Sequence, residues 1–272
     1  MVLMGYLIPY REGYNAYFNL GTFIDWGIVI IFLLYGLKLN LREVLNDVKN
    51  WKLHLLVQIA TFVLFPLLVM PFYKIAQGTE FYVLWLSIYF LACLPSTVSS
   101  SVVMVSIAKG NVPSAIFNAS ISGLIGIFAT PMLMHPFMES SSGGAVDQVA
   151  IIQQLLLKVL LPIVLGLLLN PLCKKFIERY GKLIGKFDRF IILLIVYESF
   201  STAFVNRVFS SVPPITFAII ALAAVGLFFI VYHLLGWTSR RLHFSREDTI
   251  TTTFCGSKKS LVHGSLFMMV LG

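Results

Sequence analysis

Charged residues are scarce in this 272-residue chain, and their scarcity excludes an ordinary soluble domain. Only 12% of the residues are charged, whereas soluble domains carry about 25%. Hydrophobic residues make up 58% of the chain, and the mean hydropathy is +0.88. The long apolar runs are of helix length, so the sequence predicts an all-α integral membrane protein that crosses a lipid bilayer several times.

Residues that could build an enzyme or a disulfide framework are also few. The three cysteines, Cys93, Cys173 and Cys255, are too scattered for a set of disulfides. The five histidines show no metal-ligand spacing such as HExxH, so we expect neither a metal site nor a cofactor. Glu198 is essentially the lone acidic residue within the predicted spans, which argues against paired-carboxylate catalysis. We therefore expect no catalytic residues.

Charge-poor runs define the predicted spans. They cover residues 53–73, 81–108, 110–138, 149–170, 191–206, 208–239 and 249–272. A shorter helix over 26–37 would begin at Asp25, where a carboxylate suits the positive end of the helix dipole. The 110–138 helix would end near Pro131 and Pro136. Residues 1–9 resemble the second half of a further helix, which we count as the first.

The net charge of +8 arises from the connections, not from a nucleic-acid site. Alternate connections hold 14 of the 20 basic residues, and the largest group, between residues 174 and 189, separates the sixth and seventh helices. The positive-inside rule places these connections in the cytoplasm. The loop at 139–147, which has no basic residue, would then lie outside.

Two polar segments interrupt hydrophobic runs at matching places. They are Cys-Leu-Pro-Ser-Thr-Val-Ser-Ser-Ser at 93–101 and Thr-Phe-Cys-Gly-Ser-Lys-Lys-Ser at 253–260, and their cysteines are 162 residues apart. At ~1.5 Å per residue both segments lie roughly 15 Å from the cytoplasmic helix ends, near the middle of a ~30 Å bilayer core. Interrupted spans at corresponding places in two halves are a pointer to a transporter's binding site.

The same offset of 162 residues predicts an internal repeat. It moves the helix at 22–38 onto 184–200 and the helix at 53–75 onto 215–237. The first repeat would cover residues 1–136 and the second 149–272, with the first helix partial and the tenth missing. Units of five helices insert in opposite directions, so the prediction is a ten-helix inverted-repeat (5+5) transporter fold with broken fourth and ninth helices.

The two breaks supply the candidate site residues. Pro95 removes a backbone donor, and we take it and Gly256 as the points where the helices break. Polar side chains beside them could bind a solute or free backbone groups: Ser99, Ser100, Ser101, Ser257 and Ser260. The alternative interpretation is ordinary helix packing by small polar residues.

Lys258 and Lys259 are the unusual residues of the second break, because charge inside a bilayer is costly. Either they are buried in the site, or the helix starts later and they lie in a cytoplasmic loop. If they are buried, at least one needs an acceptor or an anion, and adjacent helical residues point about 100° apart. The candidate acceptors are the break carbonyls, Gln58, Asn118 and Glu198.

Other polar residues within the spans have weaker patterns. Gln58 and Thr61 are about one turn apart, and Asn118 and Ser122 share a helix face. These four residues could either line the site or form interhelical hydrogen bonds, and the sequence leaves both interpretations open. For Lys158 we expect snorkelling or ion pairing rather than ligand binding.

At these residues the chain resembles the bile acid:sodium symporter superfamily, most of all its divergent SBF-like branch. The matching stretches are HLLVQIATFVLFP (54–66), LPSTVSSSVVMVSIAKGNVPSAIFNASISGLIGIFATP (94–131), KVLLPIVLG (158–166) and CGSKKSLVHG (255–264). The resemblance implies a core of helices 3–5 and 8–10 and a panel of helices 1, 2, 6 and 7; here the core holds helices 3–5, 8 and 9. It also implies that the two domains rock to move a substrate, and that the chain belongs in a bacterial inner (plasma) membrane.

The sodium ligands of the better-known branch are mostly absent from this chain. Its helix 4 Ser-Asn pair falls on Ser101 and Val102, and its helix 5 hydroxyl positions fall on alanine. Its helix 9 glutamate falls on Phe254, and its Gln-Asn pair falls on Lys258 and Lys259. We therefore expect a lysine ammonium to supply the fixed positive charge that sodium supplies elsewhere. Burial also disfavours a charged lysine, so protons are a further expected partner.

The resemblance and the lysines together predict secondary active transport of a small organic anion by alternating access, without sodium coupling. The alternative is a membrane regulator or receptor that keeps the fold and moves nothing. Measurable flux of a substrate would separate the two.

Overall fold

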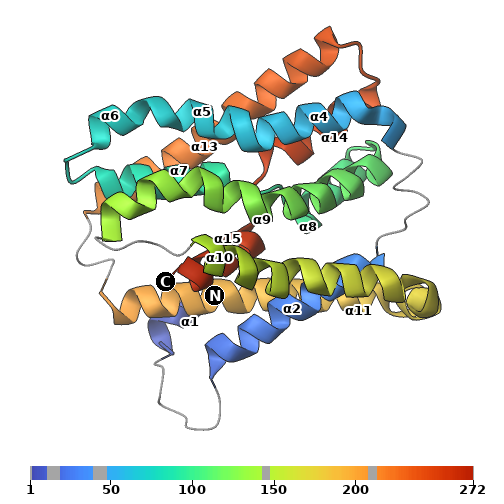
Figure 1. The fold of residues 1–272 in the computed structure, drawn as a ribbon, viewed down its shortest axis with the longest axis horizontal. Coiled ribbons are helices and arrows are strands. Elements are labelled where there is room, and N and C mark those ends of the chain that lie inside the picture. Colours follow the sequence, from blue (N-terminus) through green and yellow to red (C-terminus); the bar gives the residue numbers. More distant parts are fainter. Residues whose placement is uncertain (1, 11–18, 39–47, 143–147, 208–212, 272) are drawn as a thin grey trace. The chain divides into compact units, whose positions relative to one another are not determined.

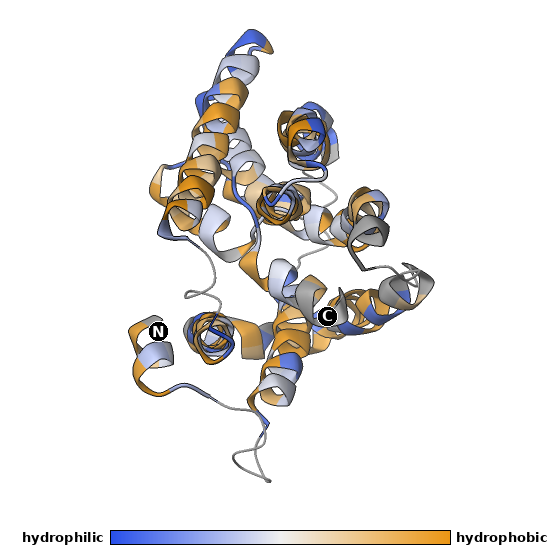
Figure 2. Ribbon diagram, turned by 90° about the vertical axis from the view of Figure 1, so that its left-hand side faces the viewer, coloured by the Kyte–Doolittle hydropathy of each residue, from blue (hydrophilic) through white to orange (hydrophobic). Residues whose placement is uncertain are grey.

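The computed structural model describes residues 2–10, 19–38, 48–142, 148–207 and 213–271. Most of these residues are helical, and no strand occurs among them (Figure 1). Within the described part of the chain, five helices are long and apolar enough to cross a membrane. Apolar residues run along most of the helical ribbon (Figure 2). The predicted all-α membrane protein is therefore confirmed, whereas the inverted repeat stays a prediction.

The helices group into two compact units, and each is described by itself. Unit 1 contains residues 1–39, 157–218 and 265–272, and unit 2 contains 40–156 and 219–264. The main helices of unit 1 are α1 (Val2–Leu7), α2 (Leu20–Lys38) and α11 (Leu161–Val205). Parts of two predicted connections (11–18 and 39–47), part of the predicted external loop (143–147) and the start of the predicted 208–239 span (208–212) lie outside the described residues.

Unit 2 is built around one long apolar helix with several irregular turns. The 51–76 span consists of α4 (Trp51–Ile59), the π-helix η2 (Ala60–Leu64), α5 (Phe65–Val69), the 3₁₀ turn η3 (Met70–Phe72) and α6 (Tyr73–Ala76). The 3₁₀ turn η1 (Val48–Asn50) precedes it. Single π turns inside helices often mark functional sites, and η2 is such a turn.

The remaining helices follow this span in the chain, and η4, α13 and α15 each contain residues of both units. They are α7 (Tyr82–Cys93), α8 (Ser99–Ile107), α9 (Val112–Ser142), α10 (Gln148–Leu155), η4 (Leu156–Leu160), α13 (Pro214–Arg241), α14 (Arg246–Ser257) and α15 (Leu261–Leu271). A buried cluster with Trp85, Tyr89 and Phe137 at its centre joins α7, α9 and the 51–76 span. Unit 2 thus has an aromatic core beside the first break.

Two predicted helix ends are wrong. Pro131 and Pro136 lie inside α9, which continues to Ser142 and so includes the start of the predicted external loop. A proline removes only one donor, and membrane helices tolerate it where neighbouring groups satisfy the freed backbone. Asp25 does not start a helix, because α2 begins at Leu20.

The predicted connection between the sixth and seventh helices is also different, because α11 stays helical from Leu161 to Val205. It is not straight, however. Asn170 Nδ2 donates to the Leu37 carbonyl (2.6 Å), and the Tyr35 hydroxyl donates to Asp188 Oδ1 (3.0 Å). A straight helix would separate residues 170 and 188 by about 27 Å, yet both bond to the same end of α2. The chain therefore reverses direction within α11 (Figure 1), as the two predicted spans require.

Close backbone approach holds the first arm of α11 against α2. A Cβ atom on Gly36 would lie 2.1 Å from the Ile163 carbonyl oxygen, and one on Gly166 would lie 2.2 Å from that of Leu33. Small residues permit such contacts between membrane helices, where packing drives association. Both glycines are therefore needed for this pairing.

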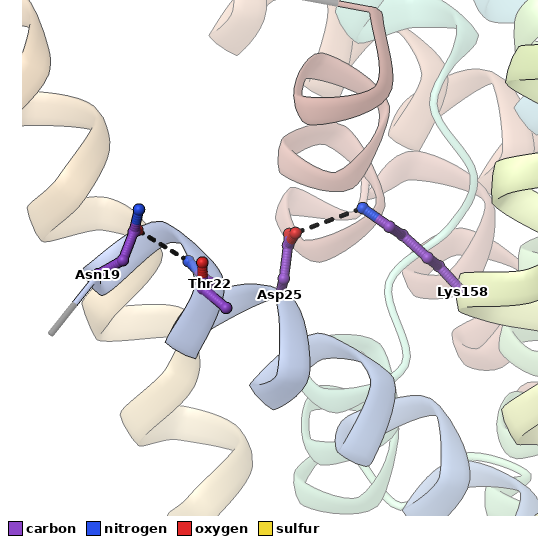
Figure 3. A network of polar contacts seen from close by, with 4 residues as sticks. All are labelled: Asn19, Thr22, Asp25 and Lys158. Carbon is purple, nitrogen blue, oxygen red and sulfur yellow. Dashed lines mark hydrogen bonds and ion pairs between the residues drawn. The ribbon is translucent and has the colours of Figure 1, made fainter. Parts of the chain in front are cut away.

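An ion pair joins α2 to η4, the short segment that precedes α11 (Figure 3). Lys158 Nζ in η4 lies 3.3 Å from Asp25 Oδ2 in α2, and both side chains are about one-third exposed. They line a cavity of about 490 Å³ with Trp26 and Leu161 among its walls. The pairing expected for Lys158 is confirmed, and Asp25 is its partner.

We expect Asp25→Asn to lower the free energy of unfolding by roughly 1.5–3 kcal/mol, because it leaves the Lys158 ammonium without its countercharge. Thermal unfolding in detergent measures this loss. The double variant Asp25→Asn/Lys158→Met should lose less than the sum of the two single variants. Additive losses would show that the pair contributes no coupling energy.

Candidate substrate and ion site

The two helix breaks lie against each other in unit 2. Residues 94–98 separate α7 from α8, and residues 258–260 separate α14 from α15. The Ser260 amide donates to the Pro95 carbonyl across 2.9 Å. Both interruptions predicted from the sequence are confirmed. Through this hydrogen bond, a backbone amide of one break pairs with a backbone carbonyl of the other.

Side chains satisfy the remaining carbonyls at the break ends. Thr130 Oγ1 donates to the Cys93 carbonyl (2.8 Å), and Ser96 Oγ donates to that of Cys255 (2.5 Å). The Ser96 amide in turn donates to Ser122 Oγ (2.9 Å). Unwound backbone at membrane depth must be buried in protein or line a cavity. Here protein groups provide the hydrogen bonds that these backbone atoms need.

A cavity of about 390 Å³ opens beside the crossing of the breaks. Its lining residues are Phe65, Leu91, Ala92, Ser100, Ala224, Leu227, Phe228, Ser257, Lys258 and Lys259. Most of the wall is apolar, and the charged lining residues in the described chain are the two lysines. The cavity therefore combines an apolar surface with positive charge.

The two lysines have different surroundings. Lys259 Nζ donates to three carbonyls, those of Thr61 (2.7 Å), Ala92 (2.7 Å) and Leu94 (2.9 Å). Within the part of the chain that the structure describes, Lys258 Nζ has a single hydrogen-bond contact, to the Ser100 carbonyl at 3.4 Å, and it lies 5.2 Å from the Phe254 ring centroid. The alternative of a later helix start is wrong, because α14 begins at Arg246 and both lysines lie in the break between α14 and α15. Of the two ammonium groups, that of Lys258 is the less committed to protein acceptors.

Several predicted site residues bond to neighbouring helices instead of lining the cavity. Gln58 Nε2 donates to Asn118 Oδ1 (3.3 Å), and Asn118 Nδ2 bonds to the Ser114 carbonyl and to His54 Nδ1 (both 2.9 Å). Ser101 Oγ donates to the Phe254 carbonyl (3.3 Å). These contacts are interhelical or local, the second of the two interpretations left open by the sequence.

The predicted residues of the second break also differ in whether they line the cavity. Ser257 lines the cavity, and its hydroxyl donates back to the Thr253 carbonyl at 2.6 Å. Ser260 caps α15, because its Oγ accepts from the His263 amide at 3.3 Å. Gly256 is not a break residue: it lies inside α14, and the non-helical residues begin at Lys258.

The remaining predicted residues are in the first break. Pro95 lies in the non-helical stretch as predicted. Ser100 lines the cavity and offers its carbonyl to Lys258. Ser99 begins α8, and its side chain lies outside the described residues.

Sequence reasoning did not single out Thr61, Ala92 and Leu94 as the acceptors of Lys259. All three act through backbone oxygens, which have no residue signature. The one available signal was Pro66, five residues after Thr61, because proline cannot donate to a helix carbonyl. Ser96 belonged to the predicted polar segment, but nothing in the sequence set it apart from its neighbouring serines.

Two interrupted helices that meet beside a charged cavity are a feature of transporter binding sites. The sequence profile of the SBF-like CPA transporter family (DUF4137) matches residues 1–271. The chain belongs to this family, and it is a transporter of the bile acid:sodium symporter superfamily.

Individual relatives agree with this assignment. An uncharacterized protein of Pseudomonas aeruginosa is 37% identical over 90% of this chain and 73% of its own length. A protein of Escherichia coli K12 that is provisionally named symporter YfeH is 37% identical over 97% of the chain and 78% of its own. The sodium/bile acid cotransporter 7 of Xenopus tropicalis is 31% identical over 86% and 68%. The names of the Escherichia coli and Xenopus tropicalis proteins are those of transporters.

We expect Ser96→Ala to lower the free energy of unfolding by about 1–3 kcal/mol, because the buried Cys255 carbonyl loses its donor. Ser87→Ala is the matched control, since the exposed Ser87 hydroxyl bonds only within its own helix. Thermal unfolding of both variants in detergent checks the difference. Equal midpoints for the two variants would contradict this role of Ser96.

Proposed function

We propose that this protein moves a small organic anion across a bacterial inner membrane by alternating access, without sodium coupling. The observation that carries the proposal is the cavity beside the breaks, where the Lys258 ammonium has one contact of 3.4 Å. An ammonium with unused donors in a mostly apolar wall favours a ligand with one anionic group. Ser100 and Ser257 supply further polar atoms on the same wall.

The chemistry of the aligned sodium positions supports the absence of sodium coupling. Hard cations take oxygen ligands, but Val102, Ala115 and Ala119 have no side-chain oxygen. The Ser101 hydroxyl already donates to the Phe254 carbonyl. In place of a carboxylate and two amides, this region contains Phe254 and two ammonium groups, so a bound cation would meet repulsion.

The names of the vertebrate relatives mention both sodium and bile acid. We carry over only the anionic character of the substrate, because Lys258 can bind an anion and the sodium positions have lost their oxygen atoms. Lys258 and Lys259 are the titratable groups that line the cavity in the described chain. We therefore propose protons as the coupling ion in place of sodium.

Uptake into proteoliposomes tests this function directly. A panel of radiolabelled small carboxylates and sulfonates would be offered to the purified protein with sodium or choline outside, with and without a pH gradient. We expect at least one anion to enter at the same initial rate in sodium and in choline. We also expect an inward proton gradient to accelerate its entry.

Lys258→Ala should lower the initial uptake rate by about tenfold or more, because a charge-assisted contact to the anion is lost. Lys52→Ala is the control, since Lys52 is exposed on the same unit and stacks beside Trp51. Its uptake rate should stay within about twofold of the unmodified protein.

Three outcomes would count against the proposal. Strict sodium dependence would reject the absence of sodium coupling, and full activity of Lys258→Ala would reject the anion contact. Binding of an anion without any flux, seen as a thermal shift in the same preparation, would favour the alternative of a regulator or receptor.

A further inference from the structure

Lys259 occupies a binding site made by the backbone. Its ammonium group has three N–H donors, and each has a carbonyl acceptor within 2.9 Å, from Thr61, Ala92 and Leu94. The ring of Phe65 covers the ammonium at 4.1 Å from Nζ to the centroid. Three oxygens and an aromatic face thus surround a single cation, and no donor is left for a substrate.

The Thr61 carbonyl is free for this contact because of an irregular turn. Inside η2 the Phe65 amide donates to the Ala60 carbonyl, one residue further back than in an α-helix. The next residue is Pro66, which has no amide hydrogen. Neither residue can therefore donate to the Thr61 oxygen, and the π turn with its proline leaves an acceptor directed out of the helix.

The other two acceptors come from the end of α7. Helix ends leave their last carbonyls without partners inside the helix. There, Thr130 bonds the Cys93 carbonyl and the Ser260 amide bonds that of Pro95. The oxygens of Ala92 and Leu94 bond to Lys259 instead. The acceptors belong to two separate segments, the π turn η2 and the end of α7 with the residue that follows it, so their convergence is a property of the fold and not of the lysine.

The Lys259 ammonium reaches these three carbonyls from the second helix break. Lys259 lies between α14 and α15, next to Ser260, whose amide is tied to the first break. The lysine therefore joins three elements: the second break, the end of α7 and the π turn η2. Its neighbour Lys258 has one long contact and lacks such a set of acceptors.

We propose that Lys259 is an internal cation held in a preformed ammonium site, and that the site binds a small primary ammonium ion when the lysine side chain is shortened. The ligand class follows from the geometry. Distances of 2.7–2.9 Å are those of N–H to O hydrogen bonds, and the acceptors are three, which suits R–NH₃⁺. Methylammonium carries this group, whereas tetramethylammonium has no N–H. This proposal does not depend on transport.

The test is chemical rescue of the full chain in detergent. The thermal unfolding midpoint of Lys259→Ala would be measured in methylammonium, tetramethylammonium and sodium chloride at equal ionic strength. We expect the midpoint to fall by several degrees in sodium chloride and to rise with methylammonium concentration, by about 2 °C or more at saturation. Tetramethylammonium should give no rise above sodium chloride.

Matched variants separate this site from a general salt effect. The unmodified protein and Lys258→Ala should show no selective response to methylammonium, because their ammonium site stays occupied. Lys259→Met fills the same volume without donors, so it should unfold at a lower temperature than the unmodified protein and should not be rescued.

Three results would overturn the proposal. They are an equal methylammonium response in all variants, no response in folded Lys259→Ala, and a Lys259→Met variant as stable as the unmodified protein. If Lys259→Ala gives no folded protein in ordinary buffer, it would be purified with methylammonium throughout. Recovery of monodisperse protein only in that buffer supports the site, and no recovery there counts against it.

Discussion

The structure of unit 2 depends on how two helix breaks satisfy their backbone groups in the absence of water. In hydrocarbon each unpaired amide or carbonyl costs several kcal/mol, so a broken span is tolerated only where other protein groups replace the missing helix bonds. Here the Ser260 amide, two hydroxyls and the Lys259 ammonium supply those bonds. The cavity exists because these replacements let both helices stop beside it.

The fold was accessible from the sequence where it depends on hydropathy and on helix-breaking residues. Charge-poor runs located the spans, and the polar segments at 93–101 and 253–260 located both breaks, with Pro95 but not Gly256 in the non-helical residues. Local rules failed where tertiary packing decides the conformation. Pro131 and Pro136 read as a helix end, yet α9 continues through them, and residues 174–189 read as a loop although α11 turns while remaining helical.

The residue composition of the candidate site was predictable from the sequence, but its hydrogen-bond partners were not. The sequence identified Lys258 and Lys259 as unusual and listed break carbonyls among their acceptors. It could not tell which lysine meets which group, because the acceptors are main-chain oxygens that every residue has. Gln58 and Asn118 had the same polar character as true lining residues, and only their mutual hydrogen bond assigns them to helix packing.

The π turn η2 has a consequence for how this site can change over evolutionary time. Because the three oxygens around Lys259 belong to the main chain, replacing the side chains of Thr61, Ala92 or Leu94 would leave the acceptors themselves in place. The vulnerable positions are those that shape the backbone, Pro66 and Pro95. Two homologous chains could thus differ at every acceptor residue and still hold the same cation. Their similarity at this site would then be detectable in the backbone conformation but not in the side chains.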